Sequence, residues 1–137
     1  MRTVVLVMAT ILLSVTACSS SKDLAAAEAE AKSFHETFNV GQFESLYDNG
    51  ADELKKSGSR QEFLELLGAI RRKLGKNVDS KRAGWRVNFA TGGTSVVIDY
   101  ETAFETGKAT EEFVYRMVSG KPLLAACHIS SKELLLR

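Results

Sequence analysis

The chain has 137 residues, which is enough for one domain with a single hydrophobic core. Hydrophobic residues make up 45% of it and charged residues 26%, the balance of an ordinary globular protein rather than of a disordered segment. The formal net charge of +1 excludes the strongly basic surface that nucleic-acid binding requires, so we expect no nucleic-acid partner.

The first seventeen residues have the layout of an export signal. Arg2 supplies one positive charge, and residues 4–13 form an apolar run that only Thr10 interrupts. The run fits the apolar core of a secretory signal and is too short to cross a bilayer as a helix, which needs roughly 20 apolar residues. Small residues follow it and end at Ala17-Cys18.

The stretch "VTAC", residues 15–18, resembles the lipobox of bacterial lipoproteins. In that family the signal is cut before the cysteine, which carries a thioether-linked diacylglycerol and usually an acyl chain on its new amino group. The resemblance implies a signal peptide over residues 1–17, lipidation of Cys18 and a membrane anchor in the cell envelope. Because Ser19 stands where an Asp tends to retain lipoproteins at the inner membrane, it also implies the outer membrane, facing the periplasm, in a Gram-negative host. The alternatives are an ordinary secretion signal in which Cys18 is incidental, and a cytosolic protein with a buried N-terminal strand.

A short lipidated tether is expected over residues 18–23, followed by a single domain over residues 24–137. The domain begins with three helical segments, because apolar residues recur at spacings of three and four from Leu24 onward. The third segment opens with "SRQE", residues 59–62, which has the spacing of a capping box. Its last turns carry basic residues at 71–73, which suit the negative end of the helix dipole; a patch for anionic lipid or nucleic acid is the alternative.

Apolar and polar residues alternate after Gly84, which predicts four antiparallel strands. Turns are indicated by "TGGT" at residues 91–94, "TGK" at 106–108 and "SGK" at 119–121. Alternation places Leu124, Ala126 and His128 on one face of the sheet. The opposite, apolar face is expected to carry Trp85, Val87, Phe89, Val96, Ile98, Tyr100, Phe104, Phe113, Tyr115, Met117, Leu123, Ala125, Cys127 and Ile129.

Helices that precede an antiparallel sheet and cover one of its faces make an α+β domain. Three segments carry a more specific resemblance: "FNVGQFESLYD", the third helix ending in "RRKLGK", and "GWRVNF" at the start of the sheet. From about Phe34 to the C-terminus, the chain resembles small bacterial domains of unknown function with the cystatin-like, NTF2-like fold, which often follow lipoprotein signals. The resemblance implies a cone-shaped domain in which N-terminal helices pack on one face of a four-stranded antiparallel sheet.

Folds of this kind enclose a pocket between the sheet and the helices. The residues expected to line it here are Phe38, Tyr47, Phe63, Trp85, Tyr100 and Tyr115. In ketosteroid isomerase, which shares the fold, a carboxylate and a tyrosine project into the pocket. Alternation in this sequence places tyrosines on the inward face but the sheet carboxylates on the outward one, which argues against isomerase-like chemistry.

The sequence has no recognised catalytic or metal-binding motif: HExxH, CxxC, GxSxG, GxGxxG and the P-loop are all lacking. We therefore expect no metal and no cofactor. His35 and His128 are far apart in the sequence, and His35 is expected on the flank of a helix, facing solvent or a backbone carbonyl. Cys127 is expected to be a buried packing residue with an unreactive thiol.

The outward face of the sheet mixes charged and apolar residues, namely Arg86, Val97, Asp99, Glu101, Val114, Arg116 and His128. Ion pairs across neighbouring strands of a solvated face explain the charges, and a general acid–base site is the alternative. The apolar members make this face a candidate surface for a homodimer or for another envelope protein.

The leading hypothesis is a membrane-anchored extracytoplasmic module, not an enzyme, that binds a protein partner or a small apolar ligand. The first alternative is an NTF2-like enzyme that acts on a small hydrophobic substrate in the pocket. The second is a structural accessory of an envelope assembly. A deep cavity with an inward carboxylate or histidine favours the enzyme, whereas an aromatic-filled core favours binding or assembly.

Overall fold

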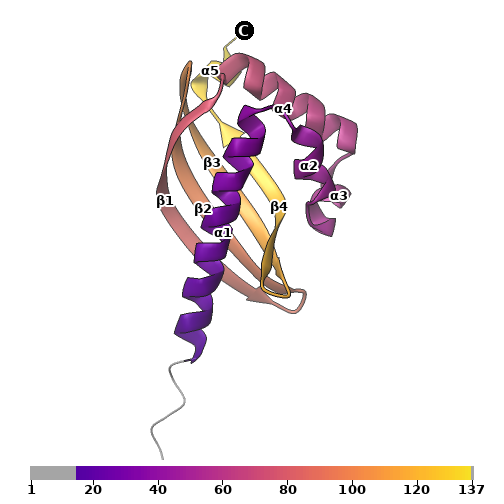
Figure 1. Cartoon of the computed structure of the whole chain (residues 1–137), viewed down its shortest axis with the longest axis vertical. Helices are drawn as coiled ribbons and strands as arrows, with labels where there is room; N and C mark the ends of the chain where they lie inside the picture. Colours follow the sequence, from indigo (N-terminus) through magenta and orange to yellow (C-terminus); the bar gives the residue numbers. More distant parts are fainter. Residues whose placement is uncertain (1–14, 137) are drawn as a thin grey trace, which may run out of the picture.

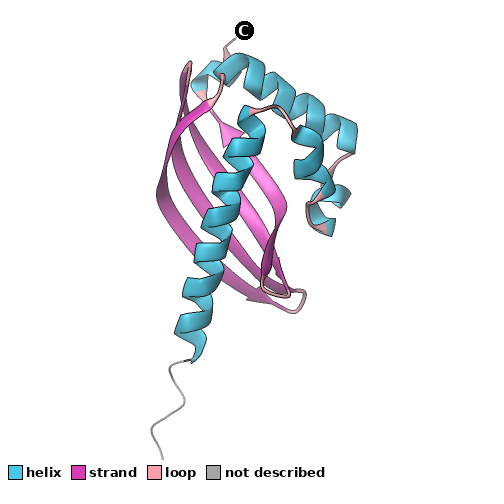
Figure 2. Ribbon diagram, in the orientation of Figure 1, coloured by secondary structure: helices cyan, strands magenta, loops and turns pink. Residues whose placement is uncertain are grey.

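The second half of the chain forms a four-stranded antiparallel sheet, and the helices of the first half pack on one of its faces (Figure 1). The computed structural model describes residues 15–136, without the side chains of residues 15–18. The elements in chain order are α1 (Val15–Asn39), α2 (Phe43–Asp48), α3 (Asp52–Ser57), α4 (Arg60–Leu74), β1 (Asn77–Ala90), β2 (Gly93–Phe104), β3 (Gly107–Val118), β4 (Lys121–Ser130) and α5 (Lys132–Leu135). This is the α+β architecture predicted from the sequence, with the helices before an open, cone-like sheet (Figure 2).

Helix α1 begins at Val15, nine residues before the predicted start at Leu24. The expected tether of residues 18–23 is therefore helical. Residues 19–23 contain no Gly or Pro, and adding turns to a helix that is already formed costs little. The expected signal peptide lies mostly outside the described residues, and of Cys18 only the backbone is described. Within residues 15–136, no helix is both long and apolar enough to cross a membrane.

Each strand of the sheet pairs with its neighbour in the chain, in the order β1-β2-β3-β4. The hairpins form at the predicted turns, and Gly93 and Gly120 adopt φ values of 118° and 76° there. Glycine tolerates this left-handed region because it has no Cβ. The consecutive hairpins make β1 and β4 the two edges of the sheet.

The core lies between α1 and the inner face of the sheet, defined here as the face that carries Ile98 and Phe113. Helix α1 places small and aromatic residues against it in helical spacing, and Ala31 and Phe34 are buried. The rings of Phe34 and Phe113 meet edge to face with centroids 4.9 Å apart. Full burial of such a side chain contributes about 1.5–3 kcal/mol, so the core holds the long helix to the sheet.

A bulge in β4 reverses part of the predicted alternation. Val114 pairs with Ala126 and Tyr115 pairs with Leu124, which leaves Ala125 as an extra residue. Leu124 consequently faces the core and Leu123 faces outward, so the prediction for these two residues was wrong. Cys127, on the far side of the bulge, is on the inner face as predicted, opposite Phe113.

The short helix α5 was not predicted. The Ser131 side chain accepts a hydrogen bond from the Glu133 N–H and donates one to the Lys108 carbonyl, 2.8 Å away. These bonds start the helix and hold it to β3. It packs beside the C-terminal end of α4.

Candidate functional site

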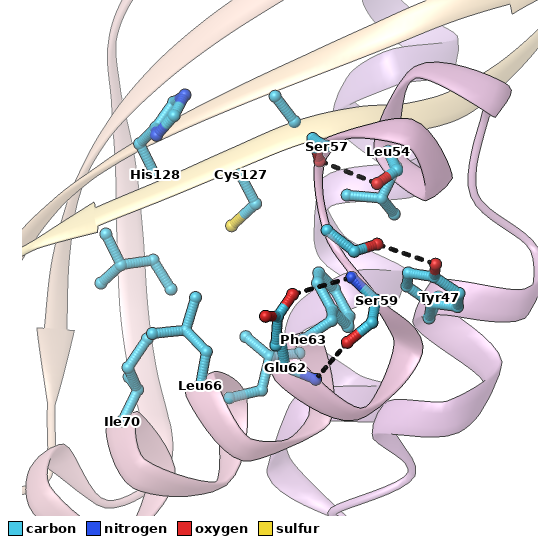
Figure 3. Close-up of a pocket in the computed structure, with 14 residues that line it drawn as sticks. Tyr47, Leu54, Ser57, Ser59, Glu62, Phe63, Leu66, Ile70, Cys127 and His128 are labelled. Carbon is cyan, nitrogen blue, oxygen red and sulfur yellow. Dashed lines mark hydrogen bonds between the residues drawn. The ribbon is translucent and has the colours of Figure 1, made fainter.

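An apolar cleft of about 600 Å³ lies between α4 and the edge strand β4 (Figure 3). Helix α4 packs against α2, α5 and α1, and its middle turns face β4 across the cleft. The lining residues come from α2, α3, α4, the loop before α4, and β4. They are Tyr47, Leu54, Ser57, Gly58, Ser59, Glu62, Phe63, Leu66, Leu67, Ile70, Ala126, Cys127, His128 and Ile129.

The helical wall of the cleft is fixed by the predicted capping box. Ser59 Oγ accepts a hydrogen bond from the Glu62 N–H at 3.2 Å, and the Ser59 N–H donates to Glu62 Oε2 at 2.9 Å. The helix then presents Phe63 and Leu66 to the cleft, and Leu66 is 55% exposed. A large apolar side chain is thus held at the surface by a helix whose start is well defined.

Contacts between α2 and the segment that begins α4 brace one end of the cleft. The Tyr47 hydroxyl on α2 donates to the Gly58 carbonyl at 3.0 Å. Arg60 at the start of α4 forms two hydrogen bonds with the Asp48 carboxylate, at 2.8 and 2.9 Å. These contacts tie α2 to the start of α4, so the cleft is preformed.

The opposite wall is the bulged strand β4, which contributes Cys127 and Ile129. Figure 3 shows the sulfur of Cys127 pointing into the cleft and the ring of His128 pointing away from it. Burial among apolar groups raises the pKa of the Cys127 thiol well above its ordinary value, and the negative charge of Glu111 raises it further. The thiol is therefore protonated at neutral pH and lines the cleft as a small neutral group.

The six residues predicted to line one pocket are separated in the structure. Tyr47 and Phe63 do meet in the cleft, with ring centroids 5.6 Å apart. Phe38, Tyr100 and Tyr115 belong to the core instead. Trp85 lies opposite Ile98 on the inner face of edge strand β1 but is 45% exposed and does not line the cleft.

A buried polar pair lies beneath α1, where the sequence predicted none. His35 Nε2 on α1 is 2.7 Å from Glu111 Oε2 on β3, and their side chains are 10% and 0% exposed. His35 is thus neither solvent-facing nor bound to a backbone carbonyl, because its partner is a carboxylate. The prediction that the sheet carboxylates all face outward was also wrong, since Glu111 faces the core.

Glu111 Oε2, the oxygen bonded to His35, also accepts a second hydrogen bond. The Thr102 hydroxyl donates to Oε2 at 2.7 Å, and the Ser80 hydroxyl lies 2.9 Å from that of Thr102. Asn77 Nδ2 donates to Ser80 Oγ at 2.8 Å, which completes a chain of polar groups that runs from β1 to β3. Glu111 Oε1 is buried and has no hydrogen-bond partner in the described part of the chain.

Aromatic rings pack around His35 in this largely buried pair. The His35 ring lies edge to face with Phe113 and Tyr100, at centroid distances of 5.6 and 6.2 Å. Burial raises the pKa of Tyr100 to about 12, and the charge of Glu28 adds to the effect. Burial likewise holds the pKa of Tyr115 well above its ordinary value. Neither His35 nor Glu111 lines the α4–β4 cleft, so a molecule in the cleft does not contact them in this conformation.

The outward face of the sheet carries charges that pair with one another. Arg86 on β1 lies 3.9 Å from Asp99 on the neighbouring strand β2, and 3.5 Å from Glu112 on β3, one strand farther away. Arg116 contacts Glu53 of α3 at 2.8 Å. Among the other residues predicted for this face, Val97 is buried, Val114 is half-buried, and Glu101 and His128 are exposed. The Arg86–Asp99 contact is the kind of cross-strand ion pair expected of a solvated face, whereas the partner of Arg116 is on a helix.

A larger hollow of about 930 Å³ opens near α5, and most of the residues that line it are of polar or charged types, including Asp79, Lys81, Glu101 and Lys132. Among the described residues, no three His, Cys, Asp or Glu side chains come together as a metal site. Most of the residues that line the α4–β4 cleft are apolar, and this cleft is the candidate site.

Similarity to known proteins gives no assignment for this chain. No model of a protein family matches it, and no curated protein matches its sequence. The geometry of the cleft and the residues near the N-terminus therefore carry the functional interpretation.

Proposed function

We propose that the protein is a lipid-anchored module of the bacterial cell envelope that binds a small apolar ligand in the α4–β4 cleft. The observation that carries ligand binding is the preformed apolar hollow of about 600 Å³. Small-molecule sites commonly have volumes of about 300–1,000 Å³ and predominantly apolar walls. The cleft has both properties.

The chemistry of the lining favours a neutral or weakly polar ligand. Leu66, Phe63 and Ile129 offer apolar surface, and the Cys127 thiol is neutral. The acidic side chain of the lining, Glu62, is engaged in the helix cap. A strongly charged ligand finds no free counter-ion among these walls, whereas an acyl chain or a small ring gains about 25 cal/mol for each Å² of apolar surface that leaves water.

The anchor is supported by the sequence "VTAC" at residues 15–18, which resembles a lipobox. A single acyl chain binds a membrane only marginally, but several together hold firmly. The protein would then lie on the outer membrane, facing the periplasm, in a Gram-negative host. A labelled fatty acid should enter the wild-type protein, and Cys18→Ser should leave an unprocessed, unlabelled precursor.

Ligand binding is tested with a neutral fluorescent probe such as N-phenyl-1-naphthylamine and two matched variants. Leu66→Lys places a charge in the cleft, and Val40→Lys places one outside it, on a valine that is 68% exposed. Burial of a leucine contributes about 1.5–3 kcal/mol, so Leu66→Lys should weaken binding about tenfold or more. The control should bind as the wild type does. Equal affinity in all three proteins would overturn the assignment of the cleft.

An enzyme acting on a small hydrophobic substrate is the second candidate, and one observation favours it. Glu111 and His35 point into the interior between sheet and helices, as an acid–base pair would. Their burial counts against it, because the Glu111 side chain is 0% exposed and aromatic rings surround His35. A substrate could reach this pair only if the core opened. Binding in the α4–β4 cleft requires no opening of the core, and it is the function we favour.

A further inference from the structure

One end of the molecule carries exposed apolar side chains next to two hairpins. Phe89 precedes the β1–β2 turn and is 69% exposed, and Val118 precedes the β3–β4 turn and is 47% exposed. We call Phe89, Val118 and the two turns the hairpin tip. Trp85 lies four residues before Phe89 on β1 and is 45% exposed. Exposed apolar groups gathered in this way usually mark a contact surface.

The start of helix α1 lies at the same end of the long axis as the hairpin tip (Figure 1). Leu24 is packed in the core, and α1 continues as a helix through Cys18. At 1.5 Å per residue, Cys18 lies only about 9 Å along the helix from Leu24. An acyl group on Cys18 would therefore hold this end of the domain close to the bilayer, with no long tether between them. This step rests on the proposed lipid anchor.

The charges at the hairpin tip suit a membrane surface. Residues 89–95 and 117–122 contain no Asp or Glu, and they include one basic residue, Lys121. The turn at the opposite end of the sheet, by contrast, is flanked by Glu105 and Lys108. Anionic lipid headgroups attract basic residues by about 1 kcal/mol each and repel acidic ones. The tip thus presents no charge that opposes contact with such a surface.

We propose that the hairpin tip inserts into the interface of the bilayer that holds the lipid anchor. Phe89 and Val118 lie at the boundary between headgroups and acyl chains. Trp85 lies up to about 13 Å farther along β1, at the rise of about 3.3 Å per residue, and so reaches headgroup level, where tryptophan is favoured. This orientation points the end that bears α4 and α5 away from the membrane (Figure 1).

The molecule has exposed apolar residues at both ends, and the position of the lipid anchor selects the end that faces the membrane. Val40, Val78, Leu135 and Leu136 are exposed too, but α5 and the C-terminal end of α1 lie at the far end from the start of α1 (Figure 1). The anchor cannot bring both ends to the same bilayer. The far end supplies a matched control for the experiment.

The test uses the lipidated protein in vesicles of phosphatidylethanolamine and phosphatidylglycerol. Trp85 is the only tryptophan, so Trp85→Phe removes all native indole emission. In that background, Phe89→Trp reports on the tip and Leu135→Trp reports on the far end, where Leu135 is 81% exposed. Lipids brominated near the headgroup end of the acyl chains quench an indole that reaches them.

The expected order of quenching is Phe89→Trp first, wild-type Trp85 second and Leu135→Trp last, with a shift of the tip emission to shorter wavelength. Val118→Ser should reduce the quenching of the tip reporter. Equal quenching at the tip and the far end, in protein whose intact mass includes the lipid, would overturn this inference and leave the anchor standing. A mass without lipid would overturn the anchor and this inference with it. A short-wavelength emission already present without vesicles, in a particle of doubled mass, would assign the tip to a second copy of the chain and also overturn the inference.

Discussion

His35 on α1 and Glu111 on β3 are joined by a 2.7 Å hydrogen bond between Nε2 and Oε2, although 76 positions separate them in the sequence. The bond fixes the long helix to the centre of the sheet at a largely buried site, where the side chains of His35 and Glu111 are 10% and 0% exposed. Taking one partner away leaves the other polar group buried without its partner, which costs far more than losing a surface contact.

We expect His35→Ala to lower the free energy of unfolding by about 3–5 kcal/mol, because the Glu111 carboxylate keeps only its bond from Thr102. Lys32→Ala on the same helix removes a 4.0 Å ion pair between exposed side chains and should have a much smaller effect. Urea denaturation followed by circular dichroism measures both. Similar losses in the two variants would show that the buried pair does not hold α1 to the sheet.

The start of α4 should depend on its capping box. Ser59→Ala removes the oxygen that accepts from the Glu62 N–H and should lower the free energy of unfolding by about 1 kcal/mol. Because the same turn shapes one end of the cleft, probe binding should weaken as well. Gln61→Ala, on the same turn, is the control and should change neither. A Ser59→Ala protein as stable as the wild type would mean that the cap contributes nothing.

Tyr100 should make the fold sensitive to alkali. Its pKa is about 12 in the folded protein and about 10 when exposed, so between these values the unfolded chain loses the proton while the folded one keeps it. Stability is thus fully present below about pH 10 and falls as the pH rises toward 12. Absorbance titration of the tyrosines and unfolding curves from pH 9 to 12 should show this, and Tyr100→Phe should make the decline shallower. A tyrosine titration complete by about pH 10 in the folded protein would contradict it.

Cys127 should react slowly with thiol reagents at neutral pH, because its raised pKa keeps the thiolate scarce. The measurement uses Cys18→Ser protein, in which Cys127 is the one remaining cysteine. The apolar probe should slow the reaction further by filling the cleft, and urea should speed it by exposing the thiol. Rapid labelling of the folded protein would indicate an activated cysteine and would favour an enzyme over a binding module.

Local patterns in the sequence predicted the elements that depend on neighbouring residues. Ser59 and Glu62 stand at the spacing of a capping box, and both of its hydrogen bonds form. The glycines at positions 93 and 120 mark turns that exist as predicted. Alternation likewise identified core-facing residues of β2 and β3 such as Ile98 and Phe113, although it missed the buried Thr102 and Ala109. These features are set by backbone geometry over a few residues, so a single sequence is enough to identify them.

The bulge at Ala125 and the inward Glu111 were not predicted, for different reasons. Nothing near Ala125 distinguishes a bulged strand from a regular one, and the one-residue shift exchanged the faces of Leu123 and Leu124. Glu111 does follow the alternation of Phe113, and extending that pattern by two residues would have placed it inward. A buried carboxylate is acceptable only with partners, and His35 lies too far away in the sequence for a local pattern to reveal it.

The cleft could be predicted only in part. Tyr47 and Phe63 were expected in a pocket and do line one, whereas Leu66 and Ile129 line it without having been predicted as pocket residues. The hollow depends on how far α4 stands from β4, and α4 is positioned by α2, α5 and α1 rather than by its own sequence. Such spacing arises from tertiary packing, which residue periodicity does not encode.

The most direct test of ligand binding in the cleft is nuclear magnetic resonance of isotope-labelled protein titrated with N-phenyl-1-naphthylamine. We expect saturable shifts of the backbone amides of Phe63, Leu66, Cys127 and Ile129, and none around Val40 or Leu135. The Leu66→Lys protein should require much more probe for the same shifts. Saturable shifts confined to the outward face of the sheet or to the hairpin tip, with the cleft amides unmoved, would contradict ligand binding in the α4–β4 cleft.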